Sequence, residues 1–362
     1  MAKIINCDNV HEAFILGIDT FRWDADIITQ KSRGGTTLEH DGPVITKFKN
    51  PCQRVIFWEP RDANPFFHFM EGLWMLGGKD DVQSLVKYNK RMIEYSDNGI
   101  TLNGAYGYRW RKYFEKDQLD IIAKRLQDDP TDRRCVLAMW DCTKDLDRDT
   151  KDTPCNTHIY FKVRNDKLNM TVCCRSNDMI WGAYGANAVH MSMLQEYMAA
   201  RIGVSVGVYN QISDSFHVYE DVYNEMEKRL PEVDYYAMKY PMTKSPYDTV
   251  SPYPMLSSED DSVRTFEQDL NAFNSLTSER WRFEHPFFIQ VVQPMYSAWK
   301  LHRESNNTKG AITLLREHCK AEDWSLACIE WLQRRQKPTL VETPTEDGGP
   351  TITGGRIDNM VV

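Results

Sequence analysis

The pattern of apolar and polar positions predicts two helices in the first 130 residues. Residues 66–76 are mostly apolar, Asn64 before them is a suitable N-cap, and Pro65 suits the first turn of a helix. A Gly-Gly pair follows and is expected to end that helix. Residues 118–126 carry apolar side chains at helical spacing, and Pro130 ends the pattern. Both helices therefore have ends that are set by local sequence.

The same pattern changes to strands further along the chain. Residues 134–140 are mostly apolar and predict a buried strand. Residues 158–163 and 168–174 flank the polar turn 164–167, which predicts a β-hairpin. Strand signals therefore follow helix signals in this part of the chain.

A third helix is expected at residues 187–202, where apolar positions recur at helical spacing up to Gly203. Residues from about 257 onward are more helical and more charged. Helices and strands thus mix without strict alternation, so the predicted class is α+β.

Composition removes several broad alternatives. The chain is 41% apolar and 27% charged, as expected of a globular protein, and its net charge is −8 without a long basic run. A nucleic-acid partner is therefore not expected, and a small anionic ligand would be held by a few arginines. No apolar run approaches the ~20 residues that span a bilayer, and the N-terminus has no secretory signal, so we expect a soluble cytoplasmic protein without membrane contact.

Nine cysteines at irregular positions indicate free thiols rather than a disulfide framework. No Cys-x-x-Cys pair is present, so no metal is expected. A single cysteine is more often a small buried hydrophobe than a nucleophile. Cys155 differs from the others because it follows a proline and precedes a hairpin that ends near Arg175. That guanidinium is expected to stabilise a thiolate and to bind a phosphate.

Further polar residues could serve the same site. Arg133 and Arg134 adjoin in a turn before a strand; such a pair is usually a solvated surface feature, but both could reach one anion. Asn187 could be only a helix N-cap, or its amide could pair with the edge of uracil. His217 could be an ordinary core histidine. Asp178 is expected to be partly buried, because apolar residues follow it.

In order and spacing, these motifs resemble the thymidylate synthase and pyrimidine-nucleotide hydroxymethylase superfamily over about residues 33–219. The carrying segments are 69–74 (FMEGLW), 102–110 (LNGAYGYRW), 129–134 (DPTDRR), 154–155 (PC) and 175–178 (RSND), followed by Asn187 and the pair His217 and Tyr219. The resemblance implies a thymidylate synthase-like fold with a large mixed sheet and a sheet-mediated homodimer.

The resemblance also implies roles for individual residues. Cys155 would be the nucleophile that adds to C6 of a pyrimidine nucleotide, Glu71 would manage proton transfers, and Tyr106 would assist at the ring. 5,10-Methylenetetrahydrofolate would supply one carbon to C5. The implied nucleotide-binding residues are Arg33, Arg175, Ser176, Asn187, His217 and Tyr219, with Arg133 and Arg134 reaching the partner's active site. The implied folate-binding residues are Asp178, Gly182, Trp74 and Val362.

Two features bear on substrate and product. The resemblance associates asparagine at position 187 with uracil and aspartate with cytosine, which favours dUMP. Methylating members keep a tryptophan just upstream of the Tyr106 loop, whereas residues 91–96 (RMIEYS) contain none, and Asn156 replaces a usual histidine. Without that shield, water could capture the methylene. We therefore expect hydroxymethylation of dUMP, as in bacteriophages whose DNA contains 5-hydroxymethyluracil, and action in the host cytoplasm.

Other functions stay open at this stage. A thymidylate synthase is the first alternative, and a dCMP or CMP hydroxymethylase is the second. An inactive scaffold homologue is disfavoured because every catalytic position is filled. The expected division is a catalytic core at 1–256, a helical elaboration of the same domain at 257–340, and a flexible tail at 341–362 that could close on the folate.

Overall fold

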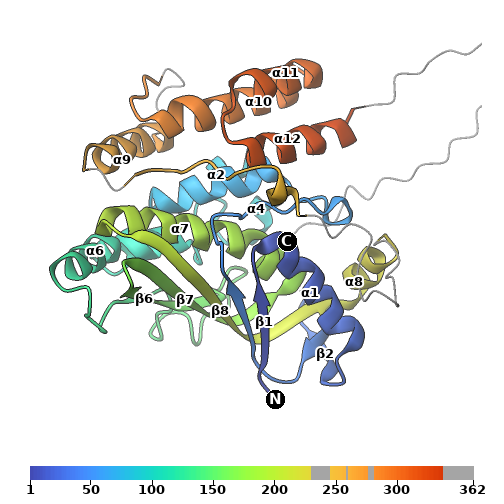
Figure 1. Cartoon of the computed structure of the whole chain (residues 1–362). Helices are drawn as coiled ribbons and strands as arrows, with labels where there is room; N and C mark the ends of the chain where they lie inside the picture. Colours follow the sequence, from blue (N-terminus) through green and yellow to red (C-terminus); the bar gives the residue numbers. More distant parts are fainter. Residues whose placement is uncertain (230–244, 258–259, 276–280, 337–362) are drawn as a thin grey trace, which may run out of the picture.

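The computed structural model describes residues 1–229, 245–257, 260–275 and 281–336 (Figure 1). Their strands are β1 (Lys3–Cys7), β2 (Ile27–Ser32), β3 (Gly35–His40), β4 (Val44–Phe48), β5 (Val136–Ala138), β6 (Asn156–Arg164), β7 (Lys167–Asp178) and β8 (Ser205–Tyr219). Their helices are α1 (Val10–Trp23), α2 (Pro65–Leu76), α3 (Gln83–Val86), α4 (Met92–Tyr95), α5 (Tyr106–Tyr108), α6 (Gln118–Asp128), α7 (Asn187–Ile202), α8 (Glu220–Glu227), α9 (Asp260–Asn274), α10 (Gln293–Arg303), α11 (Thr308–His318) and α12 (Glu322–Arg334). The 3-10 helices are η1 (Glu59–Arg61) and η4 (Pro246–Asp248), and the π-helical segments are η2 (Arg109–Tyr113), η3 (Met179–Ala186) and η5 (Phe288–Val292).

Within the described ranges, the eight strands form one mixed sheet in the order β1-β4-β8-β7-β6-β5, and β3 joins β2 to the end of β8. β7 and β8 are parallel, whereas β6 pairs antiparallel with β7. The register places Asp178 opposite His217 and Ser176 opposite Ser215. The ends of β7 and β8 therefore bring polar residues together next to the start of β6. The expected α+β class with a large mixed sheet is confirmed.

The hairpin at β6 and β7 is confirmed and is longer than the pattern indicated. Asn165 and Asp166 form its turn with φ angles of 51° and 54°, a conformation that asparagine and aspartate tolerate better than most residues. The prediction of a buried strand at 134–140 was wrong in part. The strand there is β5, three residues long at the sheet edge, and its side chains alternate, so that Leu137 is buried and Val136 is exposed.

The predicted helix caps are confirmed at both ends of α2 and at the C-terminal end of α7. Asn64 accepts a hydrogen bond from the Phe67 N–H at the start of α2, and Gly77 ends that helix. Gly203 ends α7 in the left-handed region, at a φ of 87°, which glycine adopts without a Cβ penalty. The prediction at 118–126 corresponds to α6, which begins at Gln118 as expected.

The helices stack on one side of the sheet (Figure 1). α7 lies against β7 and β8, α2 packs on α7, and α9 to α12 lie beyond α2. All residues of α2 except Glu71 are buried, as expected of a helix that is apolar on every side. It needs this composition because α7 covers one side and α9, α10 and α12 cover the other. The C-terminal helices thus complete the burial of the helix that carries Glu71.

Candidate active site

Cys155 lies immediately before β6, and its backbone is held by the side chain of Tyr106. The Tyr106 hydroxyl accepts hydrogen bonds from the N–H groups of Cys155 and Asn156, each at 3.1 Å. These two bonds leave the hydroxyl proton of Tyr106 available to donate. Burial raises the pKa of Tyr106, so the group stays a phenol. A neutral hydroxyl is therefore held against the backbone of Cys155.

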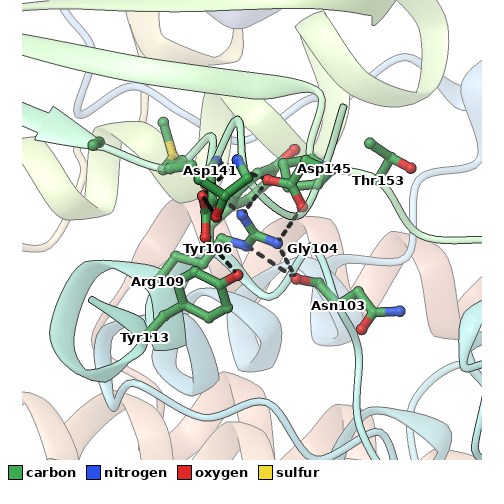
Figure 2. A network of polar contacts seen from close by, with 12 residues as sticks. Asn103, Gly104, Tyr106, Arg109, Tyr113, Asp141, Asp145 and Thr153 are labelled. Atoms are coloured by element: carbon green, nitrogen blue, oxygen red, sulfur yellow. Dashed lines mark hydrogen bonds and ion pairs between the residues drawn. The ribbon is translucent and has the colours of Figure 1, made fainter. Parts of the chain in front are cut away.

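Two loops meet at this point and are fixed by buried polar contacts (Figure 2). The Gly104 N–H donates to Asp152 at 2.7 Å, and a Cβ on Gly104 would lie 2.6 Å from an oxygen of that carboxylate. Arg109 donates to both oxygens of Asp145, at 2.6 and 2.8 Å, and to the Asn103 carbonyl. Because Asn103 and Gly104 directly precede the Tyr106 helix, these contacts position Tyr106 against Cys155.

Arginines surround the Cys155 segment. Arg175 donates to the carbonyls of Pro154 at 2.9 Å and Thr153 at 3.1 Å, and Arg33 donates to the carbonyls of Thr150 and Lys151. Burial raises the pKa of the Cys155 thiol, and the charges of Arg175 and Arg33 lower it by less. The expectation that Arg175 favours the thiolate is right in direction, but burial outweighs it in the free protein.

Glu71 projects from α2 towards α7, where it meets His190. The His190 Nε2 lies 3.2 Å from a carboxylate oxygen of Glu71 and 3.2 Å from the carbonyl of His68. Burial, and after it the charge of Asp152, raises the pKa of Glu71 to about 8, while burial lowers the pKa of His190 to about 3. Glu71 therefore holds a proton at neutral pH and can act as an acid.

Asp178 ends β7 and caps the following helical turn η3. One of its oxygens accepts from the N–H groups of Ile180 and Trp181, each at 2.8 Å. Its other oxygen, Oδ2, is buried without a hydrogen-bond partner, and burial raises the pKa of the carboxyl. Gly182 lies nearby, where a Cβ would approach the Asn177 side chain to 2.8 Å. An unsatisfied buried acceptor beside a glycine is suited to a ligand that donates a hydrogen bond.

Asn187 lies at the first residue of α7, and its side chain does not cap the helix. Its carbonyl oxygen accepts from Asn156 at 3.0 Å, and its amide donates to Asn177 at 3.0 Å. The interpretation as an N-cap was therefore wrong, because both ends of the amide point into a buried polar chain. Through Asn156, the Asn187 side chain is thus connected to Tyr106 and to the Cys155 segment.

The end of β8 supplies the other predicted nucleotide-binding residues. The His217 Nδ1 lies 3.1 Å from the Ser215 hydroxyl, and the His217 and Tyr219 rings lie edge to face at 6.1 Å. A Cβ on Gly34 would approach the Tyr219 hydroxyl to 2.7 Å, so the turn that carries Arg33 packs against Tyr219. Ser176, half-buried in β7, lies next to Arg175.

Several predicted residues lie elsewhere. Arg133 and Arg134 are exposed, and Arg134 donates to Asp132. Trp74 donates to the Asp81 carbonyl and lines a separate pocket of about 120 Å³ between α2, α3 and the segment that follows α9. That pocket contains no other predicted site residue. Val362 lies outside the described residues.

Three contributors to the site were missed from the sequence. Asp152, three residues before Cys155, accepts the hydrogen bond that anchors Gly104. His190 lies one helical turn after Asn187, a spacing that could have indicated a shared face. Arg109 gave no signal, since a buried arginine cannot be distinguished from an exposed one in a polar loop.

The described residues contain no cluster of three or more histidine, cysteine or carboxylate side chains suited to a metal ion. Among the helices of that same part of the chain, none is long and apolar enough to cross a bilayer. The nine cysteines are all free thiols.

Comparison with known proteins shows which family this chain belongs to. Residues 65–254, more than half of the chain, match the family model described as thymidylate synthase. A protein of Pseudomonas phage M6 named deoxyuridylate hydroxymethyltransferase is 42% identical over 339 residues, which cover 92% of this chain and 95% of that protein. A protein of the same name from Bacillus phage SP01 is 42% identical over 200 residues, 52% of each chain. The chain belongs to the thymidylate synthase family.

Proposed function

We propose that this protein is a deoxyuridylate hydroxymethyltransferase, which transfers one carbon from 5,10-methylenetetrahydrofolate to C5 of dUMP. The observation that carries the proposal is the 42% identity, over 92% of the chain, to a phage protein of that name. The arrangement of Cys155, Tyr106 and Asn187 supports it, because it supplies a nucleophile, a proton-handling hydroxyl and an amide that can read a base. The expected products are 5-hydroxymethyl-dUMP and tetrahydrofolate.

Binding of the nucleotide would rest on the arginines and on the end of β8. Arg175 and Arg33 already lie beside the Cys155 segment and would hold the 5′-phosphate together with Ser176. His217 and Tyr219 would contact the sugar. Phosphate binding at a distance from the reacting carbon would align C6 of the base with the sulfur.

The first chemical step would be addition of the Cys155 sulfur to C6. A sulfur–carbon bond forms, the C5–C6 double-bond electrons move towards C5 and O4, and the thiol proton passes to a base. Glu71, which holds a proton at neutral pH, would stabilise the charge that develops on the pyrimidine ring. The Tyr106 hydroxyl, whose proton is not used by its two backbone contacts, would hydrogen-bond a water molecule that takes the C5 proton.

The residues present fit a folate. The unsatisfied oxygen of Asp178 would accept hydrogen bonds from the N–H groups of a pterin. Gly182, which has no Cβ, lets the chain pack closely against the Asn177 side chain beside this carboxylate. When bound, 5,10-methylenetetrahydrofolate supplies the one-carbon unit. Asp178 does not need to titrate for this role, since its oxygen would act as an acceptor.

The hydroxymethyl product follows from access of water to the methylene on C5. Helix α4 and its flanks, residues 91–96, contain no tryptophan to shield that carbon. Tyr95 lies in this segment, half-buried, and burial raises the pKa of its hydroxyl. A phenol at this place can hydrogen-bond a water, which an indole face cannot do in the same way.

We propose a homodimer formed through the open face of the sheet. On β5 to β8 this face carries half-buried or exposed apolar side chains, among them Val136, Tyr160 and Ile212. A partner there would cover them, and the exposed Arg133 and Arg134 would reach the partner's phosphate site.

We also propose that 1–256 form the catalytic core and 257–340 its helical elaboration, because α9, α10 and α12 cover α2.

The proposal is tested by incubating the protein with methylenetetrahydrofolate and either dUMP or dCMP, then following product mass and dihydrofolate absorbance. We expect a hydroxymethylated nucleotide from dUMP without dihydrofolate. Dihydrofolate and dTMP would instead identify a thymidylate synthase, the activity in the family model's own description. Turnover of dCMP alone would refute the substrate assignment.

A further inference from the structure

A chain of five side chains runs through the core beside Cys155. The Cys174 thiol donates to the Asn156 carbonyl oxygen at 2.6 Å, and Asn156 donates to Asn187 at 3.0 Å. Asn187 donates to Asn177 at 3.0 Å, and Asn177 donates to the Ser213 hydroxyl at 2.9 Å. All five are buried, with exposed fractions of 8% or less. Each amide accepts on one side and donates on the other.

Position in the fold explains why these groups meet. Asn156 and Cys174 are paired across the antiparallel strands β6 and β7. Cys174 and Ser213 are paired across the parallel strands β7 and β8. Asn187 begins α7, just after η3, and completes the chain above the sheet. The chain therefore links three strands and one helix.

The chain leaves Asn187 with a defined remaining capacity. A carboxamide has two N–H donors and two acceptor lone pairs. Asn187 uses one of each on its neighbours, so one donor and one acceptor remain. Uracil presents an acceptor at O4 and a donor at N3–H, whereas cytosine presents a donor at its amino group and an acceptor at N3. One amide can pair with either base, but only if the amide turns over so that its oxygen and nitrogen exchange places.

We propose that Asn156 is a positioning residue that fixes the orientation of the Asn187 amide, so that the site accepts uracil and rejects cytosine. If Asn187 turned over alone, its nitrogen would face the nitrogen of Asn156 and its oxygen would face the oxygen of Asn177. Two buried hydrogen bonds would be lost at once, and two like groups would be brought together. Asn187 can turn over only if Asn156 and Asn177 turn with it.

The Cys174 end of the chain opposes such a joint turn. Burial raises the pKa of the Cys174 thiol well above its ordinary value, so the sulfur keeps its proton. A thiol is a weak acceptor, and reversal of the chain would replace its donation to a carbonyl oxygen by an amide donating to sulfur. This proposal rests on the proposed function, because it names how that site selects its base.

The test is the ratio of kcat/KM for dUMP to kcat/KM for dCMP in Asn156→Ala. Loss of the amide leaves the Asn187 oxygen without its donor, and we expect the ratio to fall about tenfold or more, the worth of one buried hydrogen bond. Asn156→His restores one N–H donor and should recover part of the ratio. Asn274→Ala is the matched control, since Asn274 is a partly buried amide that donates only to the carbonyls of Leu73 and Leu270.

Dissociation constants for dUMP and dCMP are measured alongside, so base selection is judged even if the wild type fails to turn over. That failure would defeat the proposed function, whereas an unchanged selectivity would defeat the positioning role. If Asn156→Ala does not fold, Cys174→Ala removes only the terminal donor and should lower the ratio by less. A soluble Asn156→Ala or Cys174→Ala protein with the wild-type ratio in kcat/KM and in binding would overturn the proposal.

Discussion

Arg109 and Asp145 form a buried ion pair behind the loop that carries Tyr106 (Figure 2). Their side chains are 1% and 2% exposed, and Asp145 also accepts from the Asp141 N–H. The Asp145→Ala substitution removes the carboxylate and leaves a guanidinium in a dry environment. This substitution should destabilise the fold and displace the loop.

The size of the effect can be worked out from the contacts. Removal of one partner from a buried ion pair costs about 3–5 kcal/mol, because the remaining charge is uncompensated. Arg109 would keep its bonds to the carbonyls of Asn103 and Met139, which hold part of its polar surface. We therefore expect about 3 kcal/mol, the lower end of that range.

The assay is urea unfolding followed by tryptophan fluorescence, with Asp8→Ala as the control. Asp8 pairs with Lys49 at 2.8 Å, but both side chains are more than half exposed, so its loss should leave the unfolding free energy unchanged. Asp145→Ala should also lower kcat/KM under conditions where it is folded, since Arg109 without its ion-pair partner holds the Asn103 carbonyl less firmly in place. Equal stability of the two variants would refute the reasoning about burial.

Three further predictions concern the site. Cys155→Ala should bind dUMP but release no C5 proton, which tritium exchange measures; retained release would exclude the sulfur as nucleophile. Arg175→Ala should raise the pKa of Cys155 further, so that iodoacetamide alkylation of the Cys155 peptide at fixed pH becomes slower; a faster rate would contradict the charge argument. The pKa of Glu71 is raised from 4.5 to about 8 in the fold, so the unfolded chain loses this proton first and the unfolding free energy falls as pH rises between these values. Glu71→Gln should flatten that fall and remove the loss of kcat above pH about 8; an unchanged pH profile would rule out this assignment.

Local signals account for the elements that the sequence predicted well. The ends of α2 and α7 depend on Asn64, Gly77 and Gly203, each of which acts on the backbone beside it. The strand at β5 was predicted less well, because the exposure of Val136 depends on which face of the sheet the helices cover and not on its neighbours in the sequence. Strand burial is a tertiary property, and a short apolar run does not reveal which face is covered.

The candidate site shows the same division. Cys155, Tyr106 and Asp178 lie in recognisable motifs. Cys155 and Tyr106 are hydrogen-bonded to each other, and Asp178 accepts a hydrogen bond from the Ile180 N–H. The orientation of Asn187 could not be predicted, since it depends on two amides 10 and 31 residues away in sequence. Trp74 shares a helix with Glu71, yet it lines the separate pocket beside α3 and α9, which the sequence did not indicate.

The central claim is that Cys155 directs one carbon to C5 of dUMP and that water completes the product. The most direct measurement is mass spectrometry of the nucleotide formed from dUMP and methylenetetrahydrofolate by the wild-type protein. We expect a gain of one hydroxymethyl group, with tetrahydrofolate as the second product. A methyl group with dihydrofolate would contradict it.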